Sequence, residues 1–508
     1  MEFINDIFGN LIMGFGVALS LENVLYCFVG CLLGTLVGVL PGIGPVAAIA
    51  LLLPTTFALP PVGAMIMLAG IYYGASYGGS TTAVLVNLPG ESSSVVTCLD
   101  GHAMAKNGRA GHALAISAIG SFFAGTVCTL VIAFMAPPLA EVALKFGAPE
   151  YFSLMTFGLI ASAVLARGSL MKALGMIVVG LLFGIIGTDV NSGMSRFTFG
   201  LPGLSDGIGF VVIAMAFFGL GEIIKNLETP NDQRQIFTDK VSGLMPRWVD
   251  VKDSAGAIVR GTLIGGGFGI LPGTGPIVAA FASYAVEKKV ARDNSQFGKG
   301  DIRGVAGPES ANNAAAQTAF IPTLTLGIPG SGTMALMLGA LMIQGIAPGP
   351  QVMTARPDLF WGLIASMWVG NLMLVILNLP LIGMWVQLLK VPYRMLFPAI
   401  LLFMCIGTYS LNNSIQDPLL MAFFGIVGYA FMKFGCEPAP MLLGFILGPL
   451  MEENLRRALL ISRGDPTVFF TRPISLAFLI LAALSLLIVV LPAVRKKRDE
   501  AFQGDDGG

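Results

Sequence analysis

The sequence contains few charged residues. Only 11% of its 508 residues are Asp, Glu, Lys or Arg, whereas a soluble domain has about a quarter of its residues charged. Hydrophobic residues make up 55% of the chain. Apolar runs such as 359–379 and 474–490 approach the roughly 20 residues that cross a bilayer as a helix. The composition therefore excludes a soluble globular protein and predicts a multi-pass helical membrane protein.

Recognisable catalytic and metal-binding motifs are also missing. The sequence has no HExxH, Walker A or GxSxG motif, and its six cysteines show no paired CxxC spacing. With a net charge of zero, the chain has no global attraction for nucleic acid. We therefore expect no enzyme activity, no nucleic-acid partner, no disulfide and no cofactor other than a sodium ion in a coupling role.

Glycine and proline, in contrast, are abundant and clustered, with 65 and 30 residues respectively. Two stretches match position for position. The first reads Gly30-x3-Gly34-x3-Gly38-x-Leu40-Pro41-Gly42-x-Gly44-Pro45, and the second reads Gly261-x3-Gly265-x3-Gly269-x-Leu271-Pro272-Gly273-x-Gly275-Pro276. Because every position matches at one constant offset, the pattern indicates an internal duplication. A looser pair of Pro-Gly breaks follows, at 87–92 and 327–332.

The flanking charges predict how the two copies are oriented. Basic residues lie on both sides of the second copy: Arg234, Lys240, Arg247, Lys252, Lys288, Lys289, Arg292, Lys299 and Arg303. The positive-inside rule places both flanks in the cytoplasm, so we predict a re-entrant hairpin at 257–288 that enters from that side. No Lys or Arg lies within 22–60, so this first hairpin is predicted to enter from the periplasm. Oppositely oriented halves are typical of transporters.

The predicted fold is an all-α polytopic membrane protein with two inverted-topology repeats, re-entrant helical hairpins and broken transmembrane helices. We divide it into a first transmembrane repeat (1–224), a cytoplasmic linker (225–256), a second repeat (257–450) and a C-terminal part (451–508). The last part is predicted to hold an interfacial segment, a final transmembrane helix and a basic cytoplasmic tail. Four arginines within 451–472 conflict with the outside position that counting crossings gives. Either this stretch is an interfacial helix or the count is off by one.

The Pro-Gly breaks are candidates for ion binding. Proline lacks a backbone donor and glycine permits unusual backbone angles, so the freed peptide groups must line a cavity or pack inside protein. Free carbonyls can coordinate Na⁺, and the N-terminus of the next half-helix can bind a carboxylate. The predicted substrate-binding residues at the hairpin tips are Pro41, Gly42, Gly44, Pro45, Pro272, Gly273, Thr274, Gly275 and Pro276. The upstream glycines are better explained by close helix packing.

Polar side chains gather near the second pair of breaks. Hydroxyl and amide groups can bind a carboxylate or Na⁺ without a buried fixed charge, although they also serve as interhelical hydrogen bonds. The predicted substrate-binding residues here are Tyr77, Asn87, Gly90, Ser92, Ser93, Asn312, Asn313, Pro329, Gly330, Ser331, Gly332 and Thr333. The predicted cation-binding residues are Asn87, Thr325, Gly42 and Gly273. Glu91 and Glu309 are either functional carboxylates at membrane depth or groups at a water interface.

The duplicated Gly-x-Leu-Pro-Gly-x-Gly-Pro pattern resembles the large membrane subunit of the tripartite tricarboxylate transporter family. Three further segments, 297–313, 329–333 and 453–459, continue the resemblance, which covers essentially the full chain. It implies a secondary transporter of the bacterial inner membrane that works with a small four-helix membrane subunit and a periplasmic solute-binding protein. It also implies uptake of citrate or a related carboxylate, driven by a sodium or proton gradient.

We therefore predict a carrier that imports a tricarboxylate or related organic carboxylate together with a cation, sodium being expected. By analogy with other hairpin transporters, one unit would move against a fixed frame in an elevator-like displacement. The alternatives are an anion channel, which needs a continuous pore, and a carrier of a dicarboxylate or an aromatic acid.

Overall fold

The structure is a computed structural model that describes residues 2–40, 42–166, 169–189, 192–228, 241, 243–271, 275–391 and 393–490. This described part is almost entirely helical. Its strands are one short antiparallel pair, β1 (Gly187–Thr188) and β2 (Ser195–Arg196). The all-α class predicted from composition is thereby confirmed.

The elements follow one another as a series of helices with short 3-10 and π-helical segments between them. Up to the linker they are α1 (Glu2–Ala18), α2 (Leu21–Gly38), α3 (Pro45–Leu52), η1 (Leu53–Thr56), α4 (Pro61–Val86), η2 (Ser92–Ser94), α5 (Val95–Thr97), η3 (Cys98–His102), α6 (Ala103–Lys106), α7 (Ala110–Ala143), α8 (Ala148–Leu165), α9 (Leu170–Gly184), η4 (Pro202–Leu204), α10 (Phe210–Ala214), η5 (Met215–Leu220) and α11 (Gly221–Glu228). After it they are α12 (Trp248–Ile270), α13 (Gly275–Val290), α14 (Arg303–Thr318), α15 (Phe320–Leu326), α16 (Gly332–Ile343), α17 (Gln351–Ala355), α18 (Pro357–Asn378), α19 (Ile382–Leu389), α20 (Tyr393–Asn412), α21 (Gln416–Lys433), α22 (Pro438–Ile461), α23 (Val468–Thr471) and α24 (Pro473–Val490).

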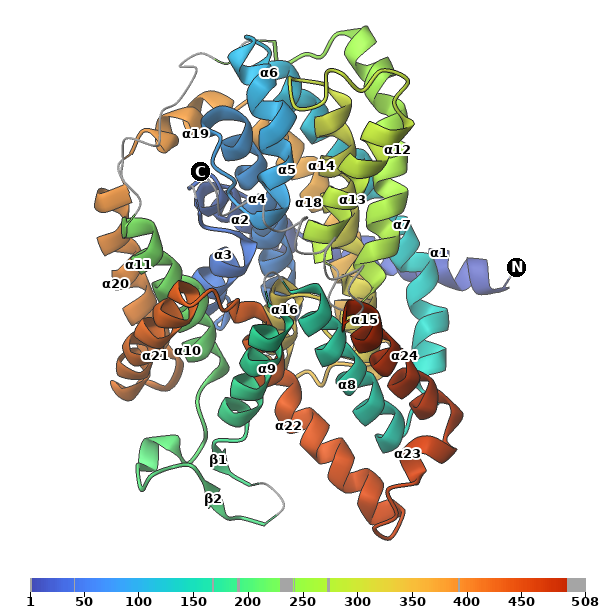
Figure 1. The fold of residues 1–508 in the computed structure, drawn as a ribbon, viewed down its shortest axis with the longest axis vertical. Coiled ribbons are helices and arrows are strands. Elements are labelled where there is room, and N and C mark those ends of the chain that lie inside the picture. The colour runs from blue at the N-terminus through green and yellow to red at the C-terminus, as the bar shows by residue number, and fades with distance from the viewer. Residues whose placement is uncertain are drawn as a thin grey trace.

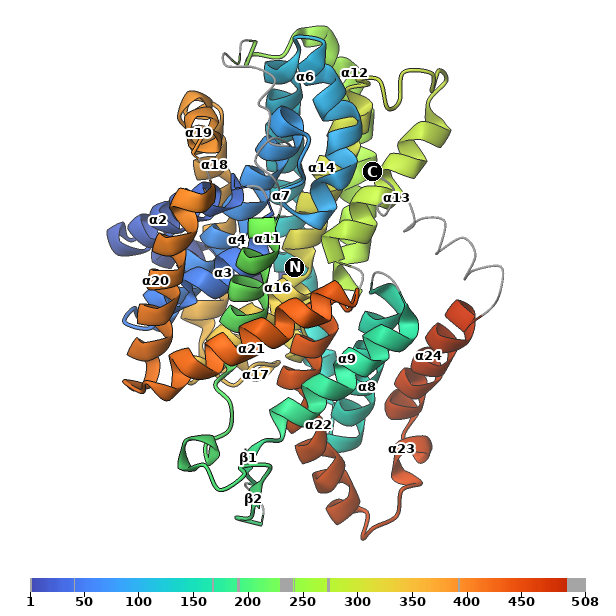
Figure 2. The same cartoon turned by 60° about the vertical axis from the view of Figure 1, so that its left-hand side comes forward.

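Helices of the two halves are interleaved along the long axis of the molecule (Figure 1). α12, α13 and α14 lie together with α6 toward one end, whereas α8, α9, α22 and α24 lie toward the other (Figures 1 and 2). α1 packs on α18, α9 on α22 and α8 on α24. Each of these contacts joins segments far apart in the sequence, so the halves form one body.

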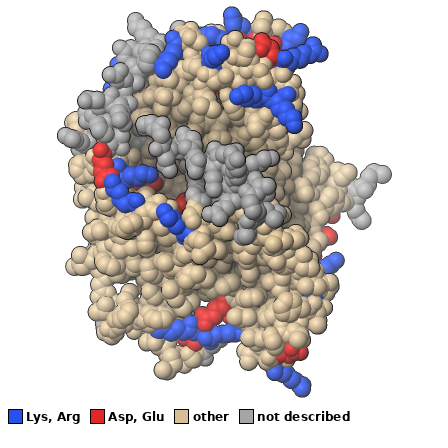
Figure 3. Space-filling model, viewed as in Figure 1, with Lys and Arg blue, Asp and Glu red and all other residues tan. Residues whose placement is uncertain are grey.

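Apolar helices long enough to cross a membrane are distributed over this body. Among the described residues, five helical segments qualify by length and composition: Leu21–Gly38, Ala110–Ala143, Phe210–Glu228, Pro357–Asn378 and Met395–Asn412. On the face shown in Figure 3, charged side chains gather at the two ends of the long axis, with smaller groups midway along both sides. A multi-pass membrane protein is the consistent interpretation.

A cluster of ion pairs lies where α12 begins. Arg109 Nη2 is 2.8 Å from Asp250 Oδ1, and Arg247 Nε is 3.1 Å from Asp250 Oδ2. Burial alone would raise the pKa of Asp250, but hydrogen bonds from Arg247 and the positive charge of Arg109 outweigh burial and lower this pKa. The pairs join the start of α7 to the start of α12.

In the first half, α2 packs on α4 with almost no side chain between the two backbones. A Cβ atom on Gly30, Gly34 or Gly38 would lie 2.3, 2.3 or 2.2 Å from a carbonyl oxygen of α4. The carbonyls are those of Met67, Ile71 and Ala75. Only glycine permits an approach this close, so the spacing of the glycines sets the contact.

In the second half, α12 makes the same contact with α14. A Cβ atom on Gly261, Gly265 or Gly269 would lie 2.2, 2.1 or 2.4 Å from a carbonyl oxygen of α14. These carbonyls belong to Gly307, Ala311 and Ala315, at one constant offset from their counterparts in α4. The packing role predicted for the upstream glycines is confirmed, and the matched contacts extend into the helix that follows each hairpin.

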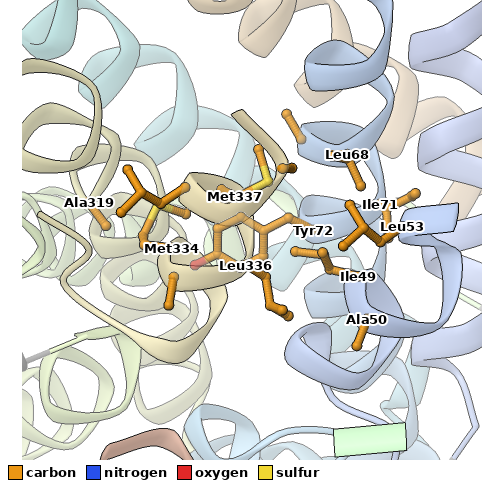
Figure 4. Packing of buried hydrophobic residues seen from close by; sticks show 14 of the residues in the cluster. Ile49, Ala50, Leu53, Leu68, Ile71, Tyr72, Ala319, Met334, Leu336 and Met337 are labelled. Carbon is orange, nitrogen blue, oxygen red and sulfur yellow. The ribbon is translucent and has the colours of Figure 1, made fainter. Parts of the chain in front are cut away.

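The main hydrophobic core joins the two halves around Tyr72 of α4. Figure 4 shows this ring between Ile49 of α3 and Met334 and Met337 of α16. These side chains are completely buried or nearly so. Both α3 and α4 of the first half therefore pack against α16 of the second half.

The glycine contact gives a matched test within one helix. In Gly265→Ala, the new methyl group would meet the Ala311 carbonyl at 2.1 Å, so α12 and α14 must separate. Overpacking of this kind costs typically about 1–3 kcal/mol, so we expect a lower unfolding temperature and less folded protein in detergent. Gly267→Ala is the control, because a Cβ atom there has nothing within 4 Å. Equal thermal stability of the two variants would contradict the proposed contact.

Candidate functional site

The second pair of breaks has the same backbone geometry in both halves. α4 ends at Asn87 with φ 58°, and α15 ends at Gly327 with φ 70°, both left-handed. Four residues on, Glu91 (φ −137°) and Ser331 (φ −157°) are extended and precede η2 and α16. A left-handed residue ends a helix by turning the chain off its axis. Although the two sequences match only loosely at these breaks, their backbone conformations therefore match.

The hairpin tips and these breaks come together in space. A Cβ atom on Gly44 would lie 3.5 Å from Glu91 Cβ, and one on Gly275 would lie 3.8 Å from Ser331 Cβ. Contacts also cross between the halves. α3 touches α16, and α13 touches η2, which contains Ser92 and Ser93. Each tip therefore meets the break of its own half, and the helix that follows it meets the break of the other half.

Several predicted residues have other placements. Pro41, Pro272, Gly273 and Thr274 lie outside the described residues. Pro45 begins α3, and Pro276 lies in the first turn of α13. Gly90 is wedged between α2 and α4, because its Cβ position lies 2.3 Å from Gly79 Cα and 3.1 Å from the Gly38 carbonyl oxygen. Pro329 and Gly330 precede the cap residue Ser331, whose hydroxyl accepts a 3.3 Å bond from the Met334 N–H in the helix that starts with Gly332 and Thr333.

Three of the residues predicted to bind a cation, Gly42, Asn87 and Thr325, lie within the described part of the chain. The Gly42 carbonyl accepts a 3.4 Å bond from the Asn226 amide. Asn87 is exposed, and the Thr325 hydroxyl donates at 2.7 Å to the Ile321 carbonyl within its own helix. A common cation site at Gly42, Asn87 and Thr325 stays a prediction, because cation ligands are acceptors that need no hydrogen bonds to one another.

A polar cavity lies between α4 of the first half and α14 of the second. It is lined by Tyr73, Ser76, Tyr77, Ser80, Ser121, Glu309, Asn312, Asn313 and Ala316. The cavity is narrow, with about 10 Å³ of space open to the centre of a water-sized molecule. The spacing of the lining residues on α4 and on α14 is that of one helical face. Of the predicted site residues, Tyr77, Asn312 and Asn313 line this cavity, which the facing helices form together.

Glu309 is the charged group of the cavity, and the first half binds it. The carboxylate is 3% exposed. The hydroxyls of Ser80 and Ser117 donate to its Oε2 at 2.8 and 3.0 Å, and the Thr97 hydroxyl donates to its Oε1. These hydroxyls come from α4, α7 and α5. The carboxylate is therefore enclosed by protein groups and shielded from bulk water.

Glu91 shows the reverse arrangement. This carboxylate belongs to the first half, and the Asn312 amide of the second half donates to its Oε1 at 3.0 Å. Across the cavity, the Tyr73 hydroxyl donates to Gln317 Oε1 at 3.0 Å. Each half therefore binds a carboxylate of the other, and polar contacts cross the interface between the halves in both directions.

Sequence reasoning did not identify Thr97, Ser117 and Ser121 as parts of the site. Thr97 follows the first-half break, whereas Ser117 and Ser121 lie one turn apart on the long apolar helix α7. Polar residues one turn apart in an apolar span usually face the protein interior, which was the available signal. Glu309, the partner of Thr97 and Ser117, is 212 and 192 positions away from them, so only the fold reveals these contacts.

The glycine-rich segment 297–304 holds a buried carboxylate from the first half. Asp100 Oδ1 accepts bonds of 2.8, 2.9 and 2.8 Å from the N–H groups of Gly298, Gly300 and Asp301. The Tyr284 hydroxyl donates to Asp100 Oδ2 at 3.0 Å. Gly298 and Gly300 have φ of +80° and +109°, which glycine adopts readily. Successive N–H groups thus form a concave anion site that fixes the loop after the second hairpin to η3.

An apolar helical body with matched helix breaks and a polar cavity between facing helices is typical of a membrane transport protein. The chain belongs to the tripartite tricarboxylate transporter TctA family, whose family model matches residues 24–443. This is a family of transporter subunits that work with other subunits and not of enzymes, so the resemblance and the expected lack of enzyme activity are confirmed.

Two curated relatives come from Agrobacterium vitis. The "Uncharacterized 52.8 kDa protein in TAR-I ttuC' 3'region" is 58% identical over 501 residues, which cover 99% of this chain and all of that protein. The "Uncharacterized protein in TAR-II ttuC' 3'region" is 60% identical over 238 residues, or 47% of this chain and 98% of that protein. No solved structure matches the chain.

The bound carboxylate gives a prediction for stability. Asp100→Asn keeps the size of the side chain but removes the charge that three N–H groups and the Tyr284 hydroxyl bind. Hydrogen bonds to charged groups contribute about 1.5–3 kcal/mol each, so we expect lower thermal stability and faster proteolysis near 297–304. Asp206→Asn, at an exposed position, is the control. Proteolysis at the wild-type rate would rule out a stabilising role for this contact.

Proposed function

We propose that the protein is the carrier subunit of a secondary transporter that imports a tricarboxylate or related organic carboxylate together with a cation, with sodium as the expected ion. The observation that carries this proposal is the polar cavity between α4 and α14. Its lining offers hydroxyls and amides from both halves. Neutral donors of this kind bind a carboxylate without the cost of a buried fixed charge.

The breaks supply the second part of a carboxylate site. α16 begins beside the break at Pro329–Gly330, and the tip residue Gly275 lies against Ser331. Helix N-termini present free N–H groups and the positive end of the helix dipole. We therefore assign the anion to the space bounded by Asn312, Asn313 and the break residues.

For the transport cycle we propose two inverted repeats with re-entrant hairpins. The matched glycine contacts of α2 with α4 and of α12 with α14 support a duplicated unit, and the flanking charges support opposite orientations. An elevator-like movement of one such unit would carry the cavity across the membrane. This step rests on analogy with other hairpin transporters.

For the surroundings we propose the bacterial inner membrane, a small four-helix membrane subunit and a periplasmic solute-binding protein. Membership of a tripartite family supports additional subunits. A carrier is preferred over an anion channel, because a channel needs a continuous aqueous pore and the described cavity is narrow. A dicarboxylate or aromatic acid would fit the same donor chemistry, so the substrate must be tested directly.

Uptake by reconstituted vesicles tests the function. With the binding protein and the small subunit present, we expect saturable [¹⁴C]citrate uptake that requires an inward cation gradient. Unlabelled di- and tricarboxylates should compete with this uptake. Imposed sodium and proton gradients should be compared separately. Uptake that persists after both gradients are removed, or that rises linearly without saturation, would favour a channel.

The cavity assignment predicts a loss of affinity in Asn313→Ala. Asn313 lines the cavity, and a hydrogen bond to a charged ligand contributes about 1.5–3 kcal/mol. The KM for the transported carboxylate should therefore rise by about 10- to 100-fold. Asn412→Ala is the control, because Asn412 is exposed and bonded to Asp417 at 2.8 Å. An unchanged KM in Asn313→Ala would remove this residue from the site.

A further inference from the structure

Six carboxylates are buried in the described part of the chain: Asp100, Glu150, Asp250, Glu287, Asp301 and Glu309. Four of them pair with arginine, as Glu150–Arg472, Asp250–Arg109, Glu287–Arg260 and Asp301–Arg303. Asp100 accepts three backbone N–H bonds instead. Glu309 differs from all of these, because its hydrogen-bond donors are neutral hydroxyls.

Glu309 also has no compensating charge nearby. Within the part of the chain that the structure describes, no lysine or arginine lies within ion-pair distance of this carboxylate. An ionised carboxylate that is buried without a counter-charge is strongly destabilising. A cation from solution is the group that would neutralise it.

The hydroxyl shell is suited to accept such a cation. Arginine and backbone N–H groups have no lone pair to offer, whereas a hydroxyl can rotate and present its oxygen. Ser80 Oγ is 2.8 Å from Glu309 Oε2 and 3.3 Å from the Ser76 carbonyl oxygen. Its hydrogen can therefore turn to that carbonyl while its oxygen faces a cation beside Glu309.

We propose that Glu309 binds the monovalent coupling cation, a sodium ion or a proton, with the hydroxyls of Ser80, Thr97 and Ser117 around it. The coupling role of the cation rests on the proposed transport function, whereas the binding of a cation by Glu309 does not. A sodium ion would coordinate the carboxylate and hydroxyl oxygens, whereas a proton would attach to the carboxylate itself. Both remove the negative charge.

The position of Glu309 on α14 explains how the cation and the carboxylate substrate are coupled. Asn312 and Asn313 follow within one turn on the face that lines the same cavity. A negative Glu309 repels an incoming carboxylate at this short distance, and the repulsion is strong away from water. Neutralising Glu309 removes it. By linkage, each ligand then raises the affinity for the other.

Other titratable groups near α14 have different partners. Glu309 acts electrostatically on two of them, Glu91 and Tyr77. On the remaining elements packed against α14, the carboxylates have their own partners: Asp100 binds Tyr284, Asp250 binds Arg109 and Arg247, and Glu287 binds Arg260. The histidines lie elsewhere, since His112 is near Asp250 and His102 contacts the Val84 carbonyl. The Tyr73 hydroxyl donates to Gln317. If a response to cations is lost when a substitution removes the Glu309 carboxylate, that response is therefore assigned to Glu309.

Cation binding can be tested on the purified full chain without any substrate. Wild type, Glu309→Gln and the exposed control Glu228→Gln are heated at rising Na⁺ at fixed pH, and separately at falling pH without Na⁺. We expect one of the two titrations to raise the Tm of wild type and Glu228→Gln but not that of Glu309→Gln. The responsive titration identifies the ion. A wild type that responds to neither, or a Glu309→Gln variant that responds like wild type, overturns the proposal.

Transport separates coupling from a structural role. In vesicles with the partner subunits, Glu309→Gln should retain [¹⁴C]citrate counterflow but lose gradient-driven accumulation by at least about tenfold, within the usual range of coupling strengths. Ser117→Ala keeps the carboxylate and should shift the cation concentration needed for half-maximal uptake. Accumulation by Glu309→Gln at the wild-type level, or loss of its counterflow as well, overturns the assignment. A wild type that does not carry citrate contradicts the proposed substrate, while the substrate-free titration still decides the role of Glu309.

Discussion

The close contact between glycine-faced helices is the constraint on which the rest of the structure depends. α2 lies so near α4, and α12 so near α14, that no side chain fits between their backbones. Each contact fixes a hairpin arm against the helix that carries the polar face of the cavity. Because both contacts use the same spacing, the breaks at the ends of α4 and α15 reach matched positions beside the hairpin tips.

Each half of the chain also binds a carboxylate of the other half. Glu309 of the second half is bound by Ser80, Thr97 and Ser117 of the first, and Glu91 of the first is bound by Asn312 of the second. Inside an apolar body, such contacts are costly to break unless another partner takes over. A cation at Glu309 and a carboxylate at Asn312 and Asn313 would be such partners, so binding would bear directly on the interface between the halves.

The Asp100 contact ties the same interface together at a different point. Segment 297–304 belongs to the motifs that carry the family resemblance, yet it does not line the cavity. Its N–H groups bind a carboxylate that belongs to the protein itself. The anion site of this glycine-rich loop is therefore filled from within, and its role is to position the loop between α13 and α14.

The sequence by itself determined the membrane class, the packing role of the glycines and the family, and it predicted an internal duplication, because hydropathy, spacing and motifs are local properties of the chain. Of the residues that the sequence predicted for a substrate site, Tyr77, Asn312 and Asn313 line the cavity. Only the tertiary structure joined Glu309 to hydroxyls on α4, α5 and α7 and showed that Asp100 binds the glycine-rich loop. Those contacts depend on how helices far apart in the chain pack on one another, and no periodicity along the sequence records that arrangement.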